Sequence, residues 1–158
     1  MKQALTAFIA LTVALVTSCD QQNSKKTENK NTTDTLLIKE LKADEYGMRH
    51  YVMAFLKKGP NRNQDSATAE KLQSAHMANI KRMADEGKLC VAGPFMDDTD
   101  IRGIYIFNVG TIEEAKKLTE SDPAIQAGRL IMELHPWYGS AALMKVTEIH
   151  KKLQTKHF

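Results

Sequence analysis

The sequence predicts an α+β fold in which two helices cover one face of a four-stranded antiparallel sheet. Strand-like apolar runs occur at residues 48–56, 88–92, 102–109 and 129–137, and helical segments occur at residues 66–86 and 111–120. The resulting order is strand, helix, strand, strand, helix, strand. This βαββαβ order is the ferredoxin-like arrangement, with both helices on the same side of the sheet.

The first strand and the long helix are separated by a turn-forming segment. The run RHYVMAFL is rich in residues that favour strands, and KKGPNRNQ after it is rich in turn residues. Asp65 or Ser66 is a suitable N-cap for the helix, and Gly87 occupies the position at which helices commonly end. We therefore expect a helix of about six turns.

The second half of the domain has equally clear boundaries. The segment GPFMDDTD separates the second and third strands, and its Gly, Pro and Asp residues favour a turn. Thr111 and Glu114 fit a capping box at the start of the second helix. Asp122 and Pro123 then begin a further short helical turn, because proline is favoured at the first helical position.

Two extensions flank this core, which spans about residues 48–139. A short helix with Asp34 as its N-cap is predicted to end at Gly47. The tail at residues 139–154 predicts a terminal helix, because four apolar residues recur at helical spacing. They are Leu143, Val146, Ile149 and Leu153.

The first and third strands are apolar on both faces. In the first strand Tyr51, Met53 and Phe55 alternate with Val52, Ala54 and Leu56; in the third, Ile104 and Ile106 alternate with Tyr105, Phe107 and Val109. The predicted order leaves one sheet face without helices, and a large apolar face is unusual on a soluble monomer. We therefore expect a homodimer packed sheet against sheet.

The N-terminus has the features of a bacterial lipoprotein signal. Residues 4–16 form an uncharged, largely apolar run of 13 residues, and VTSCD follows directly. The run is short for a bilayer span and suits a signal peptide. We expect cleavage after Ser18, a lipid on Cys19 and location in the cell envelope, on the periplasmic face or outer membrane. An ordinary secretory signal with an incidental cysteine is the alternative.

These features divide the chain into a signal peptide at residues 1–18, a lipidated cysteine and flexible tether at 19–35, and a folded domain at 36–158. The tether lacks aliphatic and aromatic side chains from residue 20 onward and cannot form a core.

The lysines and arginines are scattered along the chain, and the net charge is only +3, which argues against a nucleic-acid partner. After lipidation Cys90 is the remaining thiol, and its apolar neighbours indicate a small buried hydrophobic residue.

The folded domain resembles the YCII-related (YciI-like) family of the dimeric α/β-barrel superfamily. The resemblance rests on AHMANIKRMADEGKLCVAGPF, RGIYIFNVGTIEEA, ESDPAIQAG and ELHPWYG, which cover most of residues 48–139. It implies a dimeric barrel and a pocket between sheet and helices. It also implies an active site that pairs a histidine of the long helix with the aspartate of the Asp-Pro motif, which correspond to His76 and Asp122.

Each of these two residues also has a structural interpretation. His76 lies in the centre of an apolar arc of its helix with Ala69, Ile80 and Met83, where a backbone carbonyl could satisfy a core imidazole. Asp122 precedes a proline and is a good helix cap. If the two side chains meet, the carboxylate would orient the ring and leave its other nitrogen free as a base.

Other candidates for the pocket come from turns and aromatic residues. We predict substrate contacts from Tyr51, Pro94, Phe95 and Trp137, although packing is a simpler role for Trp137. A metal site using His135 with His50 or His76 lacks metal-ligand spacing, so the sequence predicts no metal and no cofactor.

The leading hypothesis is therefore a lipid-anchored dimer that binds a small cyclic or aromatic molecule. In it the His76–Asp122 pair would catalyse a cofactor-independent isomerase or lyase reaction by proton transfer. The alternative is a non-catalytic ligand-binding or assembly module at the membrane. The superfamily hosts several reactions, so the fold alone does not select one.

Overall fold

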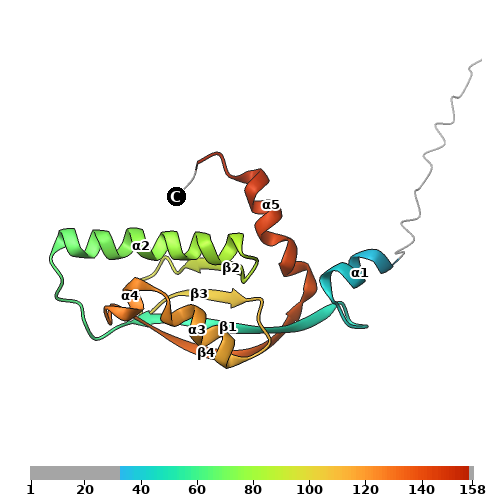
Figure 1. The fold of residues 1–158 in the computed structure, drawn as a ribbon, viewed down its shortest axis with the longest axis horizontal. Coiled ribbons are helices and arrows are strands. Elements are labelled where there is room, and N and C mark those ends of the chain that lie inside the picture. Colours follow the sequence, from blue (N-terminus) through green and yellow to red (C-terminus); the bar gives the residue numbers. More distant parts are fainter. Residues whose placement is uncertain (1–32, 157–158) are drawn as a thin grey trace, which may run out of the picture. The chain divides into compact units, whose positions relative to one another are not determined.

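The computed structural model describes residues 33–156, whose four strands form one sheet (Figure 1). The elements in chain order are α1 (Thr35–Leu41), β1 (Met48–Lys58), α2 (Ser66–Asp85), β2 (Leu89–Pro94), β3 (Ile101–Phe107), α3 (Ile112–Glu120), α4 (Pro123–Gln126), β4 (Leu130–Ser140), the 3-10 helix η1 (Ala141–Lys145) and α5 (Val146–Leu153). The predicted βαββαβ core is confirmed, as are helical segments on both sides of it.

The strands lie in the order β2-β3-β1-β4, and each neighbouring pair is antiparallel. This is the ferredoxin-like order, with the first and third strands in the centre. Strand β4 is longer than predicted and pairs with β1 along eleven residues, from Met48 opposite Ser140 to Lys58 opposite Leu130. Pro136 is accommodated within β4 because this strand lies at the edge of the sheet.

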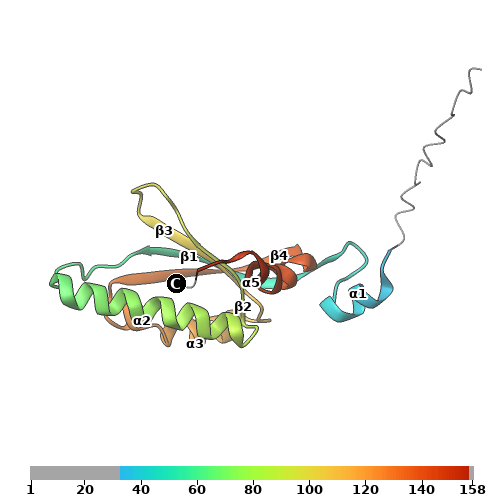
Figure 2. The ribbon, with the colours of Figure 1, turned by 90° about the horizontal axis from the view of Figure 1, so that it is seen from above.

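The main core lies between the sheet and the helices α2 and α3, which Figure 2 shows on the same side of the strands. Val52, Ala54 and Leu56 point into this core from β1, and Tyr105 and Phe107 point into it from β3. Met83 of α2 and Ala115 of α3 are fully buried against them. The alternation in the sequence thus places one apolar set of each central strand under the helices.

The opposite sheet face is partly covered by the chain itself. Tyr51, Cys90 and Ile106 are buried there against Leu143 and Met144 of η1. The expectation that this whole face is uncovered was therefore wrong, because the C-terminal segment folds back onto it. The predicted single terminal helix is instead η1 followed by α5, and both contact β2. Phe55 and Ile104, which are opposite each other in the β1–β3 register, stay half-buried on the remaining part of this face.

The predicted helix caps are confirmed. The Asp65 carboxylate accepts from the Thr68 N–H at 2.9 Å, and Asp34 caps α1 in the same way. Thr111 accepts from the Glu114 N–H at 3.1 Å at the start of α3. Each cap satisfies amide groups that the first helical turn leaves without partners. The helix boundaries therefore follow from local sequence chemistry.

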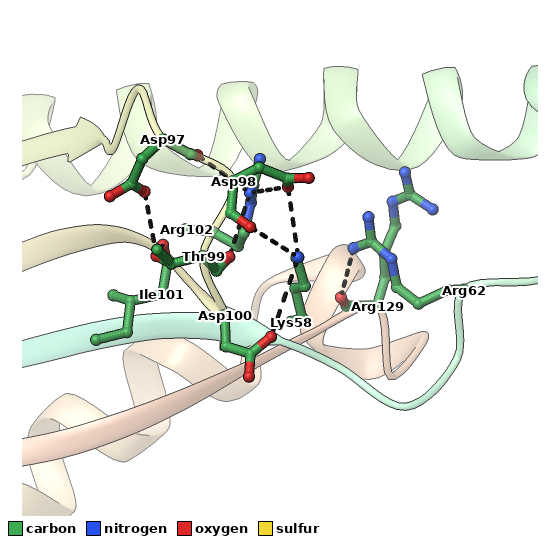
Figure 3. Close-up of polar contacts among 9 residues, drawn as sticks. All are labelled: Lys58, Arg62, Asp97, Asp98, Thr99, Asp100, Ile101, Arg102 and Arg129. Carbon is green, nitrogen blue, oxygen red and sulfur yellow. Dashed lines mark hydrogen bonds and ion pairs between the residues drawn. The ribbon is translucent and has the colours of Figure 1, made fainter.

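The turn between β2 and β3 is held by cations from neighbouring strands (Figure 3). Lys58 at the end of β1 lies 3.4 Å from the Asp98 carboxylate, and Arg102 of β3 lies 3.1 Å from the same oxygen. The groups are exposed enough that each pair contributes little stability by itself. Lys58 and Arg102 thus converge on one carboxylate oxygen in the turn that follows Pro94 and Phe95.

The predicted signal peptide, Cys19 and nearly all of the predicted tether lie outside the described residues. Thr35, the last residue of that predicted tether, is instead the first residue of α1. Within residues 33–156, every helix is too short or too polar to cross a bilayer.

Candidate functional site

His76 and Asp122 meet in the space between α2 and the start of α4. The His76 Nδ1 atom lies 2.7 Å from the Asp122 Oδ2 atom. His76 is 6% exposed and Asp122 is fully buried. Helical spacing brings His76 to the inner side of α2 together with Asn79 and Met83, which are the other buried residues of that helix. The predicted contact is therefore present.

Asp122 uses its two carboxylate oxygens for different purposes. Oδ1 accepts from the Ala124 N–H at 2.8 Å and caps α4, whereas Oδ2 binds His76 and accepts from the Asn79 side-chain amide at 3.2 Å. Burial raises the pKa of Asp122, but hydrogen bonds from His76, Ala124 and Asn79 outweigh burial and hold this pKa below its ordinary value. The carboxyl group is therefore ionised at neutral pH.

An ionised Asp122 sets the tautomer of a neutral His76. A carboxylate only accepts hydrogen bonds, so Nδ1 must carry a proton and donate it to Oδ2. The Nε2 atom of neutral His76 is then the ring acceptor, and it lies 3.3 Å from the Tyr105 hydroxyl. Burial, with a smaller contribution from the negative charge of Asp122, raises the pKa of Tyr105, which keeps this hydroxyl protonated.

Tyr105 and Asn79 are site residues that the sequence analysis missed. The Tyr105 ring stacks on the His76 ring at an interplanar angle of 18°, with centroids 6.3 Å apart. Asn79 follows His76 by three residues, so helical spacing alone could have placed it on the same face. Strand alternation places Tyr105 and Phe107 on one face of β3 but does not say whether the helices cover that face, so Tyr105 could not be assigned to the site from the sequence.

A polar chain connects the buried pair to the protein surface. Arg82 Nη2 donates to the Asn79 side-chain oxygen at 2.7 Å and to the Ser121 hydroxyl at 3.1 Å. Arg82 is also paired with Glu86 at 2.9 Å on the exposed side of α2. This chain fixes the orientation of the Asn79 amide, and Asn79 in turn supports the Asp122 carboxylate.

The four predicted substrate contacts are not brought together with this pair. Tyr51 and Trp137 pack together on the opposite sheet face, with ring centroids 5.8 Å apart. Pro94 ends β2, and the Phe95 side chain in the following turn is 43% exposed. Tyr51 and Trp137 therefore do not share a pocket with His76, because they belong to the set of side chains that faces away from the helices.

Cys90 is buried on that same face, as the sequence suggested. Burial raises the pKa of its thiol to about 11, so the nucleophilic thiolate form is scarce at neutral pH. His135 lies 2.9 Å from Glu133 on β4. In the part of the chain that the structure describes, no three potential metal ligands of the types His, Cys, Asp and Glu come together.

The family comparison agrees with the fold. A model of the YCII-related domain matches residues 50–138, which is more than half of the chain. The chain belongs to the YCII-related family. The matched segment of this YCII-related protein contains both His76 and Asp122, whereas α1, η1 and α5 lie outside it.

Comparisons with solved structures also find similar chains. The chain is similar to a 5-chloro-2-hydroxyhydroquinone dehydrochlorinase from Burkholderia phenoliruptrix, solved in complex with 2,5-dihydroxybenzoquinone. The two share 22% sequence identity with a TM-score of 0.41, over 54% of this chain and 92% of that chain. No curated protein sequence matches the chain at a significant level.

The lowered pKa of Asp122 predicts a specific pH dependence of stability. A carboxyl group whose pKa is lower in the folded than in the unfolded state stabilises the fold above its unfolded pKa, and this contribution is lost as pH falls through the folded pKa. Asp122→Asn keeps an oxygen for the α4 cap but removes the charge. We expect it to lower the free energy of unfolding by about 1–3 kcal/mol at pH 7.

Urea denaturation of the full chain between pH 2 and 7 measures this effect. The difference between wild type and Asp122→Asn should be constant above about pH 5 and should shrink below about pH 4, where Asp122 is protonated first in the unfolded state and, at lower pH, in the folded state. Asp97→Asn, in the exposed β2–β3 turn, is the matched control. A difference that stays constant down to pH 2 would show that the Asp122 charge does not contribute.

Proposed function

We propose that this YCII-related protein binds a small cyclic or aromatic molecule and transfers a proton to or from it at His76, oriented by Asp122. The observation that supports this proposal is the buried 2.7 Å contact between His76 Nδ1 and an Asp122 carboxylate whose pKa is lowered. A fixed imidazole with one nitrogen bound to a carboxylate is a common general base.

The proposed base is the Nε2 atom of His76. In the structure this atom faces the Tyr105 hydroxyl at 3.3 Å, and the His76 side chain is 7% exposed. To reach Nε2, a substrate therefore has to approach beside Tyr105. This approach requires a local movement of α2 or of β3, the strand that contains Tyr105. The base would take a proton from an acidic C–H group, and the Tyr105 hydroxyl could donate a hydrogen bond to the oxygen on which negative charge develops.

The alternative is a non-catalytic binding or assembly module, and one observation favours it. Both ring nitrogens of His76 already have partners, Asp122 on one side and Tyr105 on the other. A fully satisfied buried imidazole is also a device that fixes the packing of α2 on the sheet. In this alternative the pair stabilises the fold, and ligand binding requires no proton transfer.

Deuterium exchange separates the two proposals. Full-length protein is incubated in heavy water with a panel of cyclic ketones and unsaturated γ-lactones, and loss of the proton beside the carbonyl is followed by NMR. We expect at least one compound to exchange this proton faster with the protein than without it. In His76→Asn the exchange rate of that compound should be about 100- to 10,000-fold lower, because the general base is lost. Asp122→Asn should also slow the reaction, since the ring loses its orientation.

His150→Asn is the control, because His150 is an exposed histidine of α5, and this variant should keep the wild-type exchange rate. Exchange that persists in His76→Asn would contradict the catalytic proposal. Binding of these compounds to the wild type without any exchange would instead support the binding module.

We also propose that the protein is a homodimer joined through the part of the sheet face that η1 and α5 leave uncovered. Phe55 and Ile104 are neighbours there, and Ile131 of β4 is 46% exposed. Because Tyr51, Cys90 and Ile106 are already buried by the chain's own C-terminal segment, the proposed contact is smaller than a full sheet-to-sheet interface.

Sedimentation of the full chain at micromolar concentration tests this interface. The wild type should sediment as a dimer, and Phe55→Glu should sediment as a monomer because it would bury an unpaired charge between the sheets. Leu36→Glu makes the same type of change at an α1 residue that is 80% exposed, and should leave the dimer intact. A wild type that is monomeric at this concentration would exclude the proposed dimer.

Finally, we propose that Cys19 carries a lipid that anchors the protein to the bacterial cell envelope. The support is the sequence alone: an apolar run followed by VTSCD. Acyl chains contribute about 0.8 kcal/mol per buried methylene, so two or more chains anchor a protein stably.

Cys19→Ala in the precursor should shift the protein from the membrane fraction to the soluble fraction. Unchanged membrane partitioning would rule out lipidation at this residue.

A further inference from the structure

A cavity of about 440 Å³ lies away from the His76–Asp122 pair, where α1 and η1 meet the core. Lys42, Arg49 and Lys88 line it, together with Glu40 and Glu114. They come from four parts of the chain: Glu40 and Lys42 from α1 and its C-cap, Arg49 from the start of β1, Lys88 from the segment before β2 and Glu114 from α3. Glu40, Lys42, Arg49 and Met144 lie outside the segment that matches the family, so the N- and C-terminal extensions contribute part of the cavity wall.

The two carboxylates of the cavity already have partners. Glu40 lies 2.5 Å from Lys145 of η1. Glu114 accepts the Gly110 N–H at 2.9 Å in the loop before α3. Within residues 33–156, Lys42, Arg49 and Lys88 form no ion pair with any carboxylate, so the cavity carries an excess of positive charge.

Arg49 is the most constrained of these cations. Its Nη1 atom donates to the Leu41 carbonyl at 2.9 Å, and its Nη2 atom donates to the Asn108 side-chain oxygen at 2.8 Å. Its Nε atom is buried without an acceptor among the described residues. Both acceptors are neutral, so a half-buried guanidinium is held in place without a counter-charge. Partly buried charges are usually compensated, and here an anion inside the cavity would supply the compensation.

We propose that this cavity binds a small organic anion. The ammonium groups of Lys42 and Lys88 contact its charged group, and the fixed charge of Arg49 adds electrostatic attraction. Val109 and Met144 also line the cavity and offer apolar contact to the rest of the ligand. Neither His76 nor Asp122 lines it, so the site is independent of the proposed proton transfer.

Calorimetric titration of the full chain with benzoate, phenyl phosphate and neutral benzamide tests the proposal. We expect at least one of the two anions to bind, with an affinity that falls as salt increases, and we expect no binding of benzamide. Lys88→Gln should weaken anion binding about tenfold or more, because it removes a charged contact. Its side chain has no partner in the described fold, so this variant should fold normally.

Lys71→Gln is the matched control, since Lys71 is an exposed lysine of α2 outside the cavity. It should bind like the wild type, and so should His76→Asn. Failure of both anions to bind would overturn the proposal. Equal weakening by Lys71→Gln and Lys88→Gln would also overturn it, because binding would then follow net charge and not this cavity.

Discussion

The buried Asp122 carboxylate is the interaction on which the arrangement of this protein depends. It joins α4, which it caps through Ala124, to α2, which it contacts through His76 and Asn79. An ionised carboxyl without exposure is costly unless every oxygen is hydrogen-bonded, and here three donors satisfy it. The same bonds that hold the helices together therefore set the charge and the ring orientation of the candidate site.

The two sides of the sheet differ in composition. The helix-covered side contains the core and the His76–Asp122–Tyr105 group. The other side contains an aromatic and sulfur-rich cluster that the C-terminal segment partly covers. The proposed proton transfer and the proposed dimer contact would therefore lie on opposite faces of the sheet. The cationic cavity then adds a third surface, formed where the terminal extensions meet the core.

The sequence was sufficient for the features that depend on local chemistry. Helix caps at Asp65, Thr111 and Asp122 and the alternation along β1 and β3 predicted the elements and their order correctly. The His76–Asp122 contact joins residues 46 positions apart, and the family resemblance was needed to predict it. Helical spacing alone placed His76 on an apolar face without naming its partner.

The errors came from long-range packing. Alternation along β1 identifies two apolar sets but does not say which set faces the helices, so the sequence did not show that Tyr51 lies on the face opposite His76. Helical spacing in the tail predicted a helix without indicating that Leu143 and Met144 cover the second face. The uncompensated charge of Arg49 is also invisible in the sequence, because its neighbours come from α1 and from the loop after β3.

Nitrogen-15 NMR of the imidazole rings tests the central claim most directly. In wild-type protein at a pH where His76 is neutral, the account predicts a proton on Nδ1, donated to Asp122, and an unprotonated Nε2 that accepts from Tyr105. Tyr105→Phe should change the Nε2 signal while Nδ1 keeps its proton. A neutral His76 with its proton on Nε2 would contradict the account, because Asp122 would then not be an ionised acceptor for Nδ1.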